Sequence, residues 1–108
     1  MIEDWKYQLV VQFKVEDEGT DGLSLLDALE ENLEEIDDGR ALFDGHDIGS
    51  GEVNFFIMTN EPTSTFARLR PLLEGKGLLN RSEIAYRELD DENFSPLWPP
   101  GLKHFEVT

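Results

Sequence analysis

Cysteine is absent from this chain of 108 residues. Without thiols the protein has no disulfide framework, no thiolate zinc or iron–sulfur centre and no cysteine nucleophile. Long apolar runs are also missing, and the stretch from Met1 to Asp4 is acidic where a secretory signal would carry basic residues before an apolar segment. We therefore expect a cytoplasmic protein and no association with membranes.

Basic residues are scarce, because 9 lysines and arginines stand against 24 aspartates and glutamates, for a net charge of −15. A chain this acidic is repelled by the nucleic-acid backbone and by anionic membranes, and it attracts cationic proteins. The length suits one domain with one core, and a hydrophobic content of 39% predicts that the chain folds. The macromolecular partner that this composition favours is a basic protein.

Hydrophobic periodicity outlines the regular structure. Alternating apolar and polar residues predict a long strand from Trp5 to Val15 with one face in the core. Apolar residues at spacings of three and four predict a first helix over residues 25–38 and a second from Asn60 to Gly75, with a kink or break at Pro71. Further strands are expected over three shorter runs, residues 40–44, 53–59 and 82–89.

The order strand, helix, strand, strand, helix, strand predicts an α+β domain over residues 1–89 with the split βαβ arrangement of the ferredoxin-like fold. Residues 90–108 hold three of the five prolines, which resist regular structure, together with several large apolar side chains. We expect an ordered, proline-rich C-terminal extension packed on the same domain, because so many apolar groups are rarely left in water. The alternative is a recognition segment that displays Trp98.

Acidic residues crowd the first predicted helix. Between Lys14 and Arg40 lie eleven acids and no basic side chain, and like charges one helical turn apart destabilise a helix by about 0.2–0.5 kcal/mol per pair. A pattern that opposes local stability favours a cationic partner over simple solvation or neutralisation by the basic residues of the second helix. We therefore predict a protein-binding site made of Asp27, Glu30, Glu31, Glu34 and Glu35, with Trp98 and Phe56 as apolar anchors.

The segment from Asp44 to Glu52 concentrates three carboxylates and a histidine within nine residues. Its spacing is neither that of an EF-hand loop nor that of a phosphate-binding loop, and its glycines favour a turn from Gly45 to Gly51 within a hairpin. An alternative function is binding of a small ligand or divalent metal by Asp44, Asp47, Glu52 and Asn54.

The same run resembles a signature of small uncharacterised bacterial proteins, which carry Asp-Gly-x-Asp-x-Gly-x-Gly-Glu before an apolar strand. The resemblance implies a bacterial cytosolic protein and adds no reaction. In size and acidity the chain is also similar to the immunity proteins of bacterial toxin systems. That likeness implies stoichiometric inhibition of a basic protein.

The sheet face opposite the helices is expected to display an apolar patch of Val10, Phe56 and Met58 within a polar rim. The C-terminal segment or a second subunit would cover this patch, so a homodimer formed through the open sheet face is a further alternative. One aromatic residue is too few for a base-stacking surface, and we expect no nucleic-acid partner. His46 and His104 stand apart from other ligands. We therefore predict a non-enzymatic acidic protein-binding module, an immunity-type or regulatory inhibitor, with no catalytic residues and no cofactor.

Overall fold

The computed structural model describes residues 5–16, 18–36 and 39–107, with the side chains of residues 18–21 and 31–32 excepted. The described residues form two α-helices, one short 3-10 helix and five strands, in the order β1 (Tyr7–Lys14), α1 (Glu18–Glu34), β2 (Ala41–Gly49), β3 (Glu52–Thr59), α2 (Pro62–Gly75), η1 (Leu79–Arg81), β4 (Ser82–Glu88) and β5 (Ser95–Trp98).

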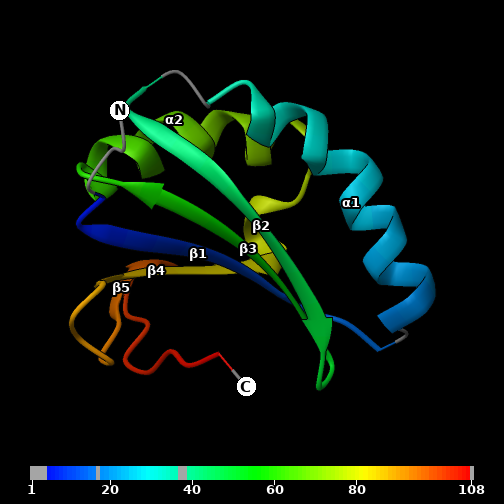
Figure 1. Cartoon of the computed structure of the whole chain (residues 1–108). Helices are drawn as coiled ribbons and strands as arrows, with labels where there is room; N and C mark the ends of the chain where they lie inside the picture. Colours follow the sequence, from blue (N-terminus) through cyan, green and yellow to red (C-terminus); the bar gives the residue numbers. More distant parts are fainter. Residues whose placement is uncertain (1–4, 17, 37–38, 108) are drawn as a thin grey trace.

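The strands make one sheet in the order β2-β3-β1-β4-β5, and every pair of neighbours is antiparallel. Both helices lie on one face of this sheet, and the C-terminal segment runs across the opposite face (Figure 1). The predicted α+β class is confirmed, and the sheet has one strand more than predicted. No helix in the described ranges is long and apolar enough to cross a membrane.

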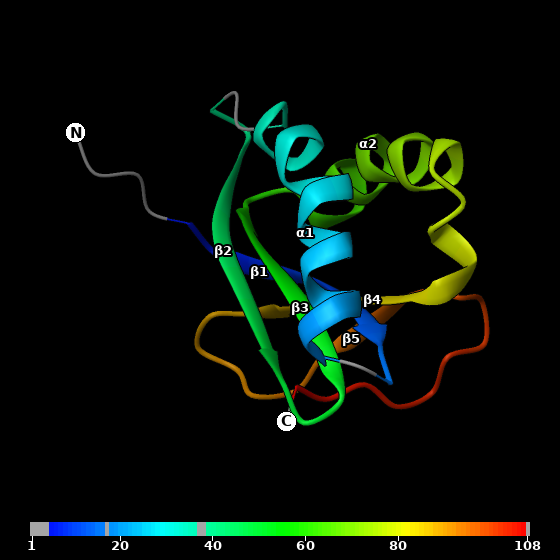
Figure 2. The same cartoon turned by 90° about the vertical axis from the view of Figure 1, so that its right-hand side faces the viewer.

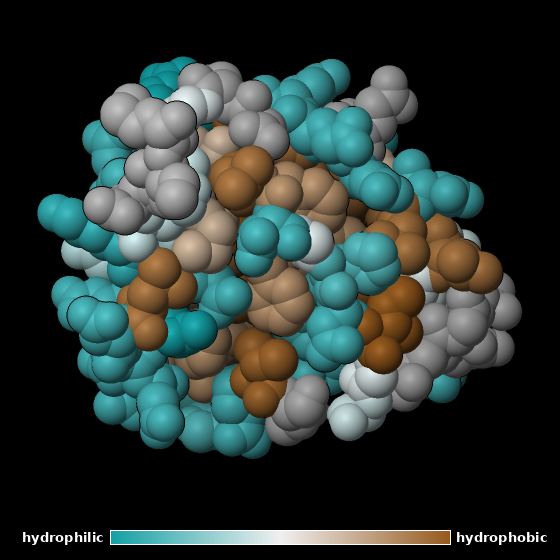
Figure 3. All heavy atoms as spheres, in the orientation of Figure 1, coloured by the Kyte–Doolittle hydropathy of each residue, from teal (hydrophilic) through white to brown (hydrophobic). Residues whose placement is uncertain are grey.

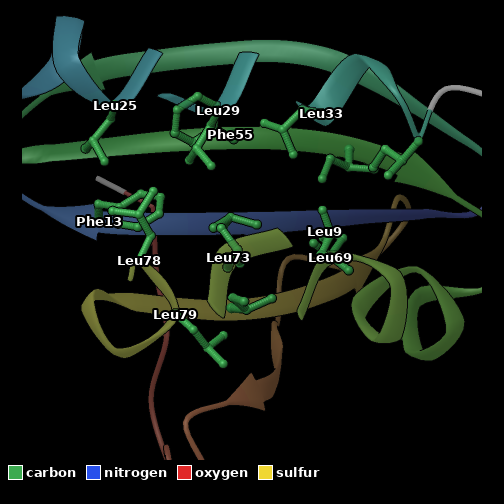
Figure 4. Close-up of a cluster of buried hydrophobic side chains, with 14 of the residues drawn as sticks. Leu9, Phe13, Leu25, Leu29, Leu33, Phe55, Leu69, Leu73, Leu78 and Leu79 are labelled. Atoms are coloured by element: carbon green, nitrogen blue, oxygen red, sulfur yellow. The ribbon is translucent and has the colours of Figure 1, made fainter. Parts of the chain in front are cut away.

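The main core lies between the sheet and the two helices. Leucines on the inner side of α1 and α2 point toward the aromatic rings of β1 and β3 (Figure 4). Phe13 and Phe55 meet edge to face, with ring centroids 6.0 Å apart, which is a favoured geometry for aromatic pairs. The largest buried side chains of this layer are Leu9, Phe13, Leu29, Leu33, Phe55, Ile57, Leu69, Leu73 and Ile84.

The first helix begins earlier than predicted, since α1 spans Glu18–Glu34 where the sequence favoured residues 25–38. Close packing explains the earlier start. Gly22 is buried, and a Cβ atom at this position would come within 3.0 Å of Ile48 Cδ1, so the first turns of α1 lie directly against β2. Glu35 follows the helix, and Asp37 and Asp38 lie outside the described residues.

Of the kink or break expected at Pro71, the break is wrong, because one helix spans Pro62–Gly75 with Pro71 inside it. The proline lies on the exposed side of α2, while Thr65, Leu69 and Leu73 form its buried side. The helix therefore loses one backbone hydrogen bond, for lack of a proline N–H, without disturbing the packing that holds it on the sheet.

The segment predicted as a short strand and a glycine-rich turn is a strand of nine residues, β2. Its register against β3 shifts between Phe43 and Gly45, which indicates a bulge at Asp44. Gly45 adopts a φ of +132°, a value that a bulge can require and that glycine tolerates. The turn itself is confined to Ser50 and Gly51, with φ values of +54° and +75°. Two positive φ values suit a tight hairpin connection.

The C-terminal segment adds a strand where none was predicted. β5 pairs with β4 at the edge of the sheet and contains Pro96, which an edge strand accommodates because one side needs no N–H donor. A second hydrophobic cluster lies on the sheet face opposite the helices. It joins buried Phe105 to Val10 and Ala85, and four half-buried side chains pack against it: Phe56, Phe94, Leu102 and Val107. The sheet is thus covered on both faces.

Candidate protein-binding site

The predicted acidic residues lie along the exposed side of α1. Asp27, Glu30 and Glu34 follow one another at spacings of three and four residues and are all exposed, so they form one stripe on the helix surface. The opposite side of α1 carries Leu25 and Leu29 and is buried. Glu35 is exposed just after the helix, and the side chain of Glu31 lies outside the described residues.

The described basic side chains form no ion pair with the acids of this stripe. Within the described ranges, no lysine or arginine forms an ion pair with Asp27, Glu30, Glu34 or Glu35. On the second helix, Arg70 pairs with Glu74 of its own helix at 3.3 Å, and Arg68 donates a hydrogen bond to the Ile36 carbonyl at 3.4 Å. No ion pair therefore joins α2 to these four acids in the described part of the chain.

Trp98 is half-buried and contacts its own chain. Its indole Nε1 donates to the Leu79 carbonyl at 3.0 Å, its ring lies 6.4 Å from that of Phe66, and the Arg70 guanidinium lies 4.9 Å from its centroid. β5 forms the sheet edge opposite to β2. Phe56 is half-buried beneath the C-terminal segment. Neither predicted anchor lies beside the acidic stripe.

The four residues predicted as ligands are divided between two environments. Asp44 and Asp47 are exposed on β2, whereas Glu52 and Asn54 are buried on β3. Asp47 lies directly opposite Asn54 in the strand register, but among the residues that the structure describes no group of three or more histidines or acids is arranged to hold a metal ion. The segment Asp44–Glu52 contains the bulge of β2 and the tight turn that leads into β3.

Sequence reasoning missed a buried polar cluster on the sheet face opposite the helices. Gln12 Nε2 lies 3.2 Å from Glu52 Oε1, 3.0 Å from Asn54 Oδ1 and 2.9 Å from the Glu106 carbonyl oxygen. Lys14 Nζ lies 2.7 Å from Glu52 Oε2 and remains 63% exposed, while the Glu52 side chain is 5% exposed. These contacts tie the C-terminal segment to β1 and β3. The signal in the sequence was the polar residues at alternate positions of these strands.

Two surface hollows among the described residues lie away from the predicted acidic and ligand residues, although the predicted anchor Trp98 lines one of them. One of about 320 Å³ is lined by Trp5, Tyr7 and Asp90, and another of about 360 Å³ is lined by Arg70, Glu74 and Trp98. Neither of these two hollows includes the predicted ligand residues or the acidic stripe of α1. The side chains of the stripe are exposed, and an exposed surface suits a macromolecule better than a small ligand, which prefers a concave site.

Comparison with protein-family models, with curated proteins and with solved structures gives no match. The resemblance of the Asp44–Phe56 run to small bacterial proteins stays a prediction. Function must therefore be inferred from the geometry and the charge of the chain itself.

Proposed function

We propose that the protein is a non-enzymatic binding module that captures a basic protein through the acidic side of α1, as an immunity-type or regulatory inhibitor does. One observation carries the proposal. Asp27, Glu30, Glu34 and Glu35 are exposed on or beside one helix, and no lysine or arginine of the described residues pairs with them. In a chain of net charge −15, this surface attracts cations over a long range.

A cationic partner would stabilise α1 for two electrostatic reasons. Glu30 and Glu34 stand one turn apart, and a like-charge pair at this spacing costs about 0.2–0.5 kcal/mol. The last turn of α1 has no basic residue, although the helix dipole favours cations there by about 0.3–1 kcal/mol per charge at low salt. A cationic partner would relieve both penalties at once, so its binding would stabilise α1.

The fold suits a rigid display of this helix. We propose that the first four strands and both helices form a ferredoxin-like unit to which β5 is added, a description that the partial order β2-β3-β1-β4 supports. We also propose that the protein acts in a bacterial cytoplasm, where a thiol-free acidic inhibitor needs no oxidative folding.

The other two candidate functions draw no support from the structure. A metal or small-ligand site would need Glu52 and Asn54 to be accessible, but both are buried and bonded to Gln12. A homodimer through the open sheet face would need Val10 and Phe56 uncovered, but the C-terminal segment packs over them through Phe105.

Charge reversal on α1 tests the proposal. The protein is used to capture binding partners from bacterial cytosol, and the affinity of the captured basic protein is then measured at rising salt. We expect Glu30→Lys with Glu34→Lys to weaken binding about tenfold or more and to flatten the salt dependence, because rim charges act on association.

A matched control separates the helix from the overall charge. Asp90→Lys with Glu92→Lys changes the net charge by the same amount at two exposed positions between β4 and β5. This variant should bind nearly as the wild type does. Equal losses in the two double variants would contradict a role for α1 and would leave only a dependence on net charge.

A further inference from the structure

We infer that the open edge of β2 binds an extended, lysine- or arginine-rich segment of the partner as an additional strand, alongside the acidic side of α1. The inference rests on the proposed function, to which it adds the form of the partner and the mode of binding. Its basis is a long sheet edge whose charge and surroundings suit one kind of occupant.

β2 is an exposed edge of sufficient length. It ends the strand order, and within the described ranges it pairs with β3 alone. The outward N–H and C=O groups of such a strand can form a further ladder with an extended peptide. The edge at the other end, β5, has four residues and contains Pro96, and short length and proline both discourage strand addition. β2, with nine residues, is the edge that remains open to pairing.

Charge selects the occupant of this edge. Asp44 and Asp47 are exposed on β2, and like charges brought opposite each other across a strand pair are destabilising. A second copy of the chain would bring its own net charge of −15 to the same edge, so self-pairing is disfavoured. A strand that carries lysine or arginine is instead attracted to the edge, because its cations approach Asp44 and Asp47 and β2 contains no lysine or arginine.

The acidic helix follows the same edge. α1 approaches β2 at Gly22 and Ile48, and Figure 2 shows the helix running alongside the strand toward the start of β2. A helix of 17 residues is about 25 Å long and a strand of nine about 30 Å. Charges act over about 8 Å at physiological salt. A cationic segment on the edge is therefore attracted by carboxylates within about this distance, and Asp44 and Asp47 lie on β2 itself.

The edge also offers apolar contact. Leu42, Phe43 and Ile48 of β2 are half-buried, and Figure 3, taken from the side on which β2 lies in front, shows brown and tan side chains among teal ones along its path. Main-chain pairing supplies affinity in strand addition, and alternate side chains supply specificity. The bulge at Asp44 interrupts the register between β2 and β3, and residues 45–49 form the longer regular stretch of β2.

Two peptides test the inference on the full chain. The first has nine residues that alternate lysine and threonine, to match the length of β2. The second has the same sequence, but its backbone nitrogens are methylated on both sides of the extended peptide. Methylation removes the N–H groups that pair with a neighbouring strand and leaves the charge unchanged. At about 20 mM salt, where screening is weak, we expect the first peptide to bind about tenfold tighter or better than the second. It should slow amide hydrogen exchange in β2 and leave β5 unchanged.

A charge variant locates the site. Asp44→Lys with Asp47→Lys should weaken the first peptide about tenfold, because two attractive charges become repulsive. The control Asp90→Lys with Glu92→Lys makes the same change in net charge away from β2 and should have a smaller effect. Equal effects of the two variants would overturn the assignment to the β2 edge.

The remaining outcomes separate this inference from the proposed function. Equal affinity of the two peptides, with β2 exchange unchanged, would overturn strand addition while cationic binding by α1 stands. If the peptides bind equally and Glu30→Lys with Glu34→Lys abolishes binding, α1 alone is the site. Failure of the wild type to bind either peptide at low salt would overturn the strand-addition inference, and the capture experiment with the α1 variants would still decide the proposed function.

Discussion

Phe105→Ala should destabilise the protein by about 3 kcal/mol, because the C-terminal segment forms the second hydrophobic layer of the sheet. Phe105 is 7% exposed and packs on Val10 and Ala85, which are fully buried. Its ring also meets that of Phe94 edge to face at 5.0 Å. Phenylalanine to alanine changes in cores cost about 3–5 kcal/mol. The lower end applies here because the resulting cavity opens near the surface, where water and neighbouring side chains can fill it.

Urea and thermal unfolding measure this loss directly. A change of about 3 kcal/mol should lower Tm by about 12 °C or more in a domain of this size, and the m value should stay near that of the wild type if the unfolding remains cooperative. Leu23→Ala is the control, since Leu23 is 63% exposed on α1 and its change should stay within about 0.5 kcal/mol. If Phe105→Ala lowers the free energy of unfolding no more than Leu23→Ala does, the C-terminal segment does not stabilise the protein by packing on the sheet.

Two further substitutions test single elements. Pro71→Ala should stabilise the protein by about 1–2 kcal/mol in thermal unfolding, because it restores a hydrogen-bond donor inside α2. Part of this gain is lost, because the unfolded chain with alanine has a larger conformational entropy. A loss of stability would show that the exposed ring makes a favourable contact. Trp98→Phe should cost about 1 kcal/mol in urea unfolding, because it removes the hydrogen bond to the Leu79 carbonyl. Unchanged stability would contradict the role of this bond in holding β5.

The periodicity of apolar residues was sufficient to predict β1, β3 and the buried side of α1. The alternation in β1 and the apolar run of β3 predicted both strands within two residues at each end, because the side-chain period of a strand is a property of consecutive residues. The helical period also predicted that Leu29 and Leu33 are buried on α1 while Asp27 and Glu30 on the same helix are exposed. The acidic surface could therefore be recognised without coordinates.

Long-range contacts decided the rest. β2 extends through a glycine-rich stretch because β3 offers it a pairing edge, and α1 starts early because Gly22 packs against Ile48. Glu52 and Asn54 resembled ligands in the sequence, yet they are buried through contacts with Gln12, about 40 positions away, and Gln12 in turn bonds Glu106, 94 positions away. Periodicity is visible among neighbouring residues, whereas strand register and the covering of a sheet face depend on segments that meet only when the whole chain has folded.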